Sequence, residues 1–223
     1  MTGAMRALVT GGTGRIGSAV AARLESDGWT VVAAGRRDGD LARPDEARAL
    51  VERATDELGG LDLVVNGAAE GFVAKPVMEV GEADWDAAFG ATAKGSFFVT
   101  QAAAPHLRSA RGLVVMIEDV AAYQPWPSFA PHCAAKAAQA MLTRVLAKAL
   151  APEVRVCGVA PGPVAVASEQ EPRRAAETVL GRVGSPEDVA EAVAYLAGAE
   201  FVTGASLVVD GGRLLQSRPP DDA

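Results

Sequence analysis

Residues 9–17, VTGGTGRIG, follow a short apolar segment and precede a run with helical spacing. Glycines in such a loop let the backbone approach a phosphate, and the N-terminus of the following helix offers N–H groups and a partial positive charge. A lone glycine-rich loop is a weak signal, but a strand before it and a helix after it make it more specific. The stretch therefore predicts a nucleotide-binding α/β fold. The alternative is a tight turn that requires glycine.

Outward from this loop, apolar segments alternate with helical patterns along the whole chain. Strands are expected at residues 5–10, 30–35, 61–66, 112–117, 153–162 and 205–212. Helices are expected at residues 18–28, 44–58, 82–108, 131–151 and 186–198. This order predicts one α/β domain over residues 1–214, with the doubly wound parallel sheet and three layers of a Rossmann fold. Residues 215–223 are expected to form a disordered tail.

Composition and charge exclude several classes of partner. The chain has 223 residues and a formal net charge of −7, without a basic cluster, which argues against nucleic acid or an anionic membrane as a partner. No apolar run approaches the length of a membrane span, and no metal site is predicted. Cys133 and Cys157 lie in apolar segments and are expected to be buried thiols outside any disulfide, which favours the cytoplasm.

The end of the second expected strand indicates which dinucleotide fits. NAD-binding sites carry an acid about 20 residues past the glycines, for the ribose hydroxyls. This chain has Arg36 and Arg37 there instead, and Arg15 adds a third cation inside the glycine loop. Arginines suit a 2′-phosphate through charge-assisted hydrogen bonds, which predicts NADP(H) in preference to NAD(H). The alternative is that these arginines only solvate a surface loop.

Several longer segments form a pattern known from one superfamily. They are TGGTGRIG (10–17), LDLVVNGAA (61–69), DWDAAFGATAKGSFFVTQAAAPHL (84–107), GLVVMIEDVAA (112–122), KAAQAMLTRVLAKALAPEVRVCGVAPGPV (136–164), GRVGSPEDVAEAVAYL (181–196) and FVTGASLVVDGG (201–212). Over about residues 5–214 the chain resembles the short-chain dehydrogenase/reductase superfamily. Within it, the chain is most similar to the bacterial pteridine reductases and dihydromonapterin reductases.

The resemblance implies a set of catalytic residues. The superfamily has a Tyr, a Lys four residues later, and a Ser thirteen residues before the Tyr, which is an Asp in pteridine reductases. Here Lys136 and Asp119 match, whereas His132 stands at the Tyr position and Thr92 replaces the superfamily's structural Asn. An imidazole also transfers protons near neutral pH, so Asp119, His132 and Lys136 are the expected catalytic residues. The alternative for His132 is drift at a position that has lost its chemistry.

The resemblance also implies the cofactor contacts and some departures from the pattern. The expected cofactor-binding residues are Gly11, Thr13, Arg15, Ile16, Gly17, Arg36, Arg37, Asp40, Leu41, Asn66, Gly67, Ala68, Lys136, Pro161, Gly162 and Val164. Residues 36–43 are too few for the superfamily's usual helix and third strand. The pterin-stacking position falls on Gly71, with Phe72 one residue later, and the loop after Gly162 predicts a reduced substrate lid.

The function implied by this resemblance is an NADP(H)-dependent reductase that transfers hydride to a small C=O or C=N substrate, as pteridine reductases do. Two alternatives stay open: a non-redox proton-transfer enzyme, such as an isomerase or lyase, and an inactive nucleotide-binding homologue. Relatives pair through helices that correspond to residues 82–108 and 131–151. The resemblance therefore implies a homodimer or homotetramer.

Overall fold

The computed structural model describes residues 4–70 and 72–216, and within them a six-stranded parallel sheet lies at the centre. The strands are β1 (Arg6–Thr10), β2 (Thr30–Ala34), β3 (Leu63–Asn66), β4 (Leu113–Ile117), β5 (Arg155–Pro161) and β6 (Ser206–Val209). Their order across the sheet is β2-β1-β3-β4-β5-β6, so the winding reverses between β1 and β3. This arrangement confirms the predicted Rossmann fold, and each expected strand is present with shorter bounds.

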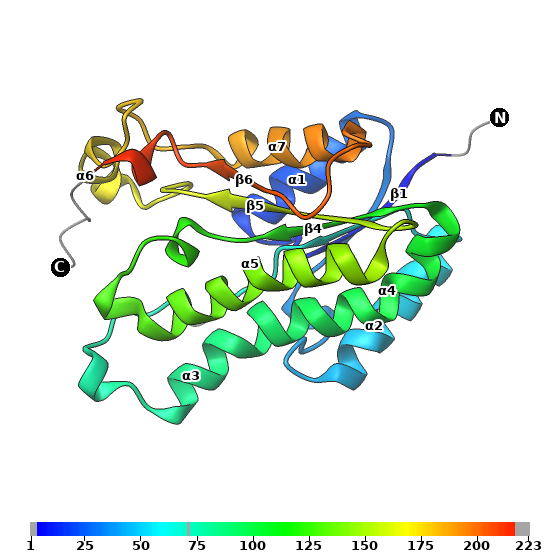
Figure 1. The fold of residues 1–223 in the computed structure, drawn as a ribbon, viewed down its shortest axis with the longest axis horizontal. Helices are drawn as coiled ribbons and strands as arrows, with labels where there is room; N and C mark the ends of the chain where they lie inside the picture. The colour runs from blue at the N-terminus through cyan, green and yellow to red at the C-terminus, as the bar shows by residue number, and fades with distance from the viewer. Residues whose placement is uncertain (1–3, 71, 217–223) are drawn as a thin grey trace.

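Helices cover both faces of the sheet (Figure 1). One face carries α1 (Arg15–Ser26) and α7 (Pro186–Gly198), and the other carries α2 (Pro44–Leu58), α4 (Ser96–Ala110) and α5 (Ala130–Leu150). Alternate strand residues supply the two cores, because successive side chains point to opposite faces. On β3, for example, Val64 packs with α2 and α4 while Val65 packs with α1 and α7. Both faces are buried, which explains why the strands are apolar throughout.

The helix expected at residues 82–108 is divided into three segments. α3 (Glu82–Phe89) leads into a π-helical stretch, Gly90–Gly95, and α4 follows. The two glycines are close to the chain that follows β2: a Cβ on Gly90 would lie 2.9 Å from Ala42 Cβ, and one on Gly95 would lie 3.0 Å from Leu41 Cβ. Residues 82–108 are therefore largely helical, as expected, but the sequence did not predict the π-helical stretch within them.

The connection between β2 and α2 contains only a 3₁₀ turn, Arg36–Asp38, so β2 is the edge of the sheet. This agrees with the short segment expected there. After β5, a 3₁₀ turn (Ser168–Gln170) and α6 (Glu171–Ala176) form a short cover that the sequence did not predict as a helix.

The two cysteines differ in burial. Cys157 is buried, but Cys133 is only half-buried, because it lies on the side of α5 that faces the loop around Trp126. Among the described residues, no helix has both the length and the apolar character needed to cross a bilayer. Gly71 and residues 217–223 of the expected tail lie outside the described residues, and Leu215 ends a 3₁₀ turn that begins at Arg213.

Candidate active site and cofactor pocket

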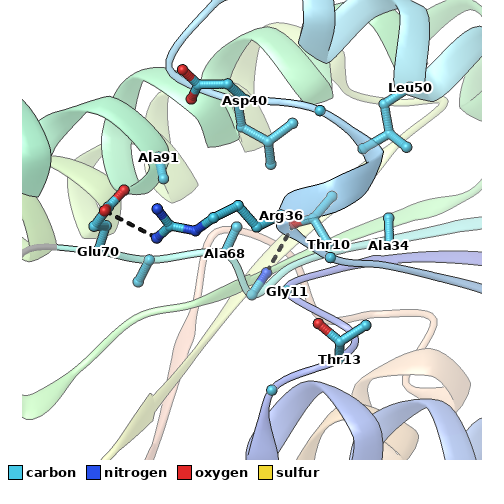
Figure 2. Close-up of a pocket in the computed structure, with 16 residues that line it drawn as sticks. Thr10, Gly11, Thr13, Ala34, Arg36, Asp40, Leu50, Ala68, Glu70 and Ala91 are labelled. Atoms are coloured by element: carbon cyan, nitrogen blue, oxygen red, sulfur yellow. Dashed lines mark hydrogen bonds and ion pairs between the residues drawn. The ribbon is translucent and has the colours of Figure 1, made fainter.

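A pocket of about 520 Å³ opens at the carboxyl ends of β1, β2 and β3, beside the point where the winding reverses (Figure 2). Ligands of open parallel sheets bind at this place. Its walls are Thr10, Gly11, Thr13, Gly14, Ala34, Gly35, Arg36, Gly39, Asp40, Leu41, Leu50, Gly67, Ala68, Ala69, Glu70 and Ala91. The glycine loop of the sequence thus forms one wall, and the loop after β3 forms the other.

Glycine is required in this loop because there is no room for side chains. Gly11 has φ +67°, and a Cβ there would lie 2.6 Å from the carbonyl oxygen of Gly67. A Cβ on Gly17 would overlap the carbonyl oxygen of Gly11. α1 begins behind the loop with Gly14 as its N-cap, and no side chain caps it. Its first N–H groups therefore remain for an anion, so this cradle fits the pyrophosphate of a dinucleotide.

Arg36 extends across the pocket toward Glu70, as Figure 2 shows. Arg36 Nη2 lies 3.0 Å from Glu70 Oε1, and the two side chains are 78% and 43% exposed. Glu70 follows the NGAA segment of the loop after β3, and sequence reasoning did not single it out. The sequence shows an acid directly after this segment, but only the fold brings that acid to Arg36.

The predicted cofactor residues fall into two groups. Those that line the pocket are Gly11, Thr13, Arg36, Asp40, Leu41, Gly67 and Ala68. Those outside its walls are Arg15, Ile16, Gly17, Arg37, Asn66, Lys136, Pro161, Gly162 and Val164. Of these, Arg15 and Arg37 are exposed, whereas Asn66 is buried at the end of β3, where its Nδ2 donates to Thr100 Oγ1 at 3.0 Å.

The predicted catalytic side chains come together at the carboxyl end of β4 and the start of α5. His132 Nε2 lies 3.4 Å from Asp119 Oδ2, and Asp119 Oδ1 accepts a hydrogen bond from the N–H of Ala121 at 2.8 Å. His132 and Lys136 are one turn apart on the buried face of α5. The backbone N–H bond fixes the Asp119 carboxylate, so one oxygen remains directed to the imidazole.

Lys136 is almost completely buried, which rules out a solvated helix lysine. Its Nζ donates to the carbonyl oxygen of Ile117 at 2.8 Å and to Gln139 Oε1 at 3.1 Å. Burial lowers the pKa of Lys136, while the negative charges of Asp119 and Glu118 act in the opposite direction. The amine is thus fixed in place by two acceptors at the end of β4.

His132 is only 6% exposed, and two aromatic side chains contact its ring. Phe72 meets the imidazole edge-on at 4.8 Å between ring centroids, and Trp126 stacks on it at 6.5 Å. Phe72 itself stacks on Phe129 at 4.5 Å and is more than half exposed to solvent. The cofactor pocket and three other cavities formed by the described residues have no wall from His132. Phe72 and Trp126 thus cover part of the imidazole.

Sequence reasoning missed a buried acid beside this site. The carboxylate of Glu118 accepts hydrogen bonds from Tyr123 Oη at 2.9 Å, Thr143 Oγ1 at 2.7 Å and Ser206 Oγ at 3.0 Å. The three hydroxyls satisfy a side chain that would otherwise be costly to bury. The position of Glu118, directly after the apolar run LVVMI, was the feature of the sequence that could have indicated this buried acid. Thr92, at the expected Asn position, is buried, and its hydroxyl has no partner among the described residues.

Comparison with known proteins gives consistent matches across the chain. A family model described as enoyl-(acyl carrier protein) reductase matches residues 37–213. The granaticin polyketide synthase putative ketoacyl reductase 2 of Streptomyces violaceoruber is 37% identical over 236 residues, which cover 92% of this chain and 94% of that protein.

Solved structures agree with this match. A 3-ketoacyl-(acyl-carrier-protein) reductase from Brucella melitensis, complexed with NADH, has a TM-score of 0.87 at 26% identity, covering 94% of this chain and 98% of that one. A blue fluorescent protein from a metagenomic library, in complex with NADPH, has a TM-score of 0.85 at 30% identity, covering 94% and 97%.

Proposed function

The chain belongs to the short-chain dehydrogenase/reductase superfamily of oxidoreductases, and from this premise we propose that it reduces a small C=O or C=N compound with NADP(H) in preference to NAD(H). The observation that supports this most is the glycine-walled pocket with Arg36 at its rim. When bound, a nicotinamide supplies the hydride. The chain's own residues bind the nucleotide, orient the substrate and deliver the proton.

The cofactor part of the proposal rests on the pocket walls. The N–H groups at the start of α1 would hold the pyrophosphate, and Asp40 and Leu41 would border the adenine. Arg36 would bind the 2′-phosphate, since a guanidinium pairs with phosphate oxygens through two N–H groups. The Arg36–Glu70 ion pair must then be exchanged for the phosphate.

The proton would come from the Asp119–His132 pair. A contact of 3.4 Å lets the carboxylate orient the imidazole and stabilise its charged form. Lys136, fixed by Ile117 and Gln139, would bind the nicotinamide ribose. Hydride addition would leave a negative charge on the oxygen of a C=O group or on the nitrogen of a C=N group. His132 and Asp119 are the two groups that would supply the proton to this atom.

The substrate implied by the sequence resemblance is a pteridine. Phe72 supports a flat substrate, because its ring lies beside His132, is more than half exposed and can stack on an aromatic compound. The similarity to proteins described as ketoacyl reductases supports a ketoacyl compound as the alternative substrate. NADPH oxidation with dihydropterin, acetoacetyl thioester and simple aldehydes distinguishes these classes.

The assembly and location belong to the same proposal. A homodimer or homotetramer through α3–α4 and α5 is supported by Trp85 and Met141, large apolar side chains exposed on these helices. Light scattering of the purified protein measures the assembly. Its acidic surface charge and two thiols outside any disulfide are consistent with the cytoplasm.

A second function is favoured by the closed site. His132 lies beneath Phe72 and Trp126, and Thr92 replaces a structural Asn, which fits a protein that binds the nucleotide without turning it over. A non-redox proton transfer by the Asp119–His132 pair is the related alternative. Both predict cofactor binding without net NADPH consumption.

The test is a titration with NADPH and NADH followed by nucleotide fluorescence. The natural chain is compared with Lys136→Ala and Arg36→Ala, and Arg108→Ala is the matched control because Arg108 is exposed in the last turn of α4 and lies outside the pocket walls. We expect tighter binding of NADPH than NADH, weakened by the first two changes and not by the third. Failure to bind either nucleotide would refute the reductase function.

A further inference from the structure

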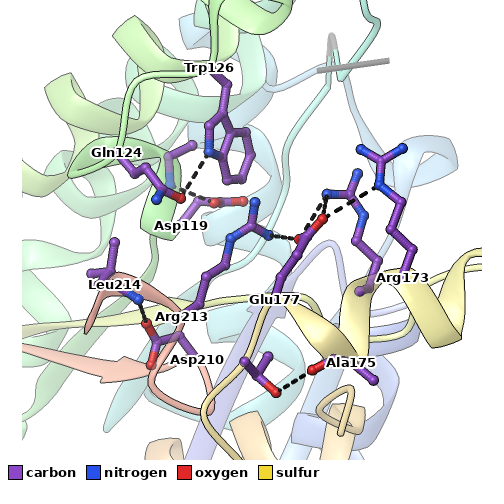
Figure 3. A network of polar contacts seen from close by, with 12 residues as sticks. Asp119, Gln124, Trp126, Arg173, Ala175, Glu177, Asp210, Arg213 and Leu214 are labelled. Atoms are coloured by element: carbon purple, nitrogen blue, oxygen red, sulfur yellow. Dashed lines mark hydrogen bonds and ion pairs between the residues drawn. The ribbon is translucent and has the colours of Figure 1, made fainter. Parts of the chain in front are cut away.

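Arg213 is a buried cation close to the proposed site (Figure 3). It lies directly after the glycines that follow β6 and is only 3% exposed. Its guanidinium carbon stands 4.8 Å from the centre of the Trp126 ring, and its Nη1 is 3.2 Å from Glu177 Oε2. Its Nε has no hydrogen-bond partner among the described residues. A guanidinium offers five N–H donors, so Arg213 is poorly satisfied.

The acids around Arg213 have other partners. Glu177 also accepts hydrogen bonds from Arg174 Nη1 at 3.1 Å and lies 3.6 Å from Arg173 Nε. Asp210 accepts from the N–H groups of Gly212 and Leu214 at 2.7 and 2.8 Å. Asp119 is bound to His132 and the N–H of Ala121. These contacts leave Arg213 short of acceptors, and burial lowers its pKa.

Arg213 also lies within reach of the reacting groups. Its guanidinium contacts Trp126, and the same Trp126 ring stacks on His132 with an interplanar angle of 8°. Figure 3 shows the Arg213 side chain pointing between Asp119, Trp126 and Glu177. One ring, that of Trp126, therefore contacts both Arg213 and the proposed proton donor His132.

We propose that Arg213 binds a carboxylate of the substrate, so that the enzyme prefers carbonyl compounds that carry a carboxylate on an aromatic or apolar body. This inference rests on the proposed reductase function and narrows its substrate class. In the reaction, hydride adds to the carbonyl carbon and a proton from the Asp119–His132 pair goes to the oxygen. The carbonyl becomes an alcohol, the cofactor is oxidised by two electrons, and the carboxylate is unchanged.

The alternative is a purely structural arginine that secures the segment before α7 through Glu177. Arg174 provides the matched control, because it binds the same Glu177 carboxylate but is only half-buried and does not contact Trp126. If holding Glu177 is the only role of Arg213, removing either guanidinium will have similar effects. If Arg213 binds a carboxylate of the substrate, only the removal of Arg213 will change the difference in affinity between a charged and a neutral compound.

The probes are 4-formylbenzoate and its methyl ester, which differ in one negative charge. Calorimetric titration of the protein saturated with NADP⁺ measures their binding without turnover. We expect 4-formylbenzoate to bind the natural chain about tenfold to a hundredfold more tightly than the ester, since a hydrogen-bonded charge pair has that strength. Arg213→Met should remove this preference, Arg213→Lys should retain part of it, and Arg174→Met should leave it unchanged.

Equal affinity for the two probes in the natural chain, binding of neither, or an equal loss in Arg174→Met would overturn the inference. NADPH oxidation with both aldehydes separates this result from the proposed function. Equal reduction of the two aldehydes retains the reductase and refutes the role of Arg213. Selective binding of the carboxylate without any reduction refutes the reductase and retains the carboxylate site. Thermal unfolding of the three variants confirms that each is folded before titration.

Discussion

Glu70→Gln should raise the affinity for NADPH. In the structure Glu70 holds Arg36, the proposed ligand of the 2′-phosphate, at 3.0 Å. The phosphate therefore competes with a carboxylate that is already in place. Glutamine keeps the size of the side chain and removes its charge, which releases Arg36 without opening a cavity.

The exposure of the two side chains limits the size of the effect. With Arg36 78% exposed and Glu70 43% exposed, water and salt screen the pair, and exposed pairs of this kind contribute about 0.2–1 kcal/mol. Releasing Arg36 should therefore tighten NADPH binding by about 1.4-fold to fivefold. NADH has no 2′-phosphate, so its affinity should stay the same. The gain should shrink between about 0.02 M and about 0.5 M salt, because the interaction is electrostatic.

The assay is a fluorescence titration of both nucleotides at both salt concentrations. Glu57→Gln is the control, because it removes one negative charge at the far, C-terminal end of α2, away from the pocket walls. The reasoning is wrong if Glu70→Gln weakens NADH and leaves NADPH unchanged. That result would mean that Glu70 binds the ribose hydroxyls and that the site prefers NAD(H).

Three further substitutions test other parts of the structure. Burial lowers the pKa of Lys136 in the folded chain below its ordinary value of 10.5. Between the folded pKa and 10.5 the unfolded chain binds more protons, so the unfolding free energy of the natural chain should rise with pH relative to Lys136→Met, by about 1.4 kcal/mol for each unit by which the pKa is lowered. Urea unfolding of both chains at several pH values measures this difference. Arg182 and the N–H of Ser185 hold the pKa of Asp188 at about 2. Asp188→Asn should therefore lower the free energy of unfolding by about 1 kcal/mol at neutral pH. In thermal melts, the difference in stability between the natural chain and this variant should shrink as pH falls from 3.8 toward 2. Gly17→Ala should weaken NADPH binding at least about tenfold, because its Cβ meets the backbone of Gly11, whereas Gly198→Ala, which has open space, should bind NADPH normally in the same titration.

The fold was predictable because its signals are local. Apolar strands buried on both faces and helices with clear ends, such as Ser185-Pro186 before α7, need no knowledge of distant contacts. The division of the 82–108 helix was not predicted, because it depends on Leu41 and Ala42 lying against Gly90 and Gly95. The two glycines were visible in the sequence, but their partners were not.

The candidate site was predictable only as far as it follows a motif. The spacing of the motif predicted that Asp119, His132 and Lys136 lie near one another. The other partners of each side chain could not be predicted, because they depend on the folded chain. Trp126 stacks on the nearby His132, but Arg213, which contacts the same ring, comes from a segment far away in sequence. Glu118 was not predicted as a site residue, because its burial depends on three hydroxyl partners, two of which, Thr143 and Ser206, are distant in sequence.

The position of β2 at the rim of the sheet has a consequence for protein engineering. The outer edge of this strand is not paired within the described residues, and only residues 35–43 separate it from α2. Lengthening that connection costs only about 0.6 kcal/mol for each doubling of a flexible loop. A designed insertion there could add a strand beside β2 and deepen the wall around the adenine end of the pocket. The core on either face of the sheet would remain as it is, so cofactor selectivity could be redesigned at this rim independently of the chemistry near α5.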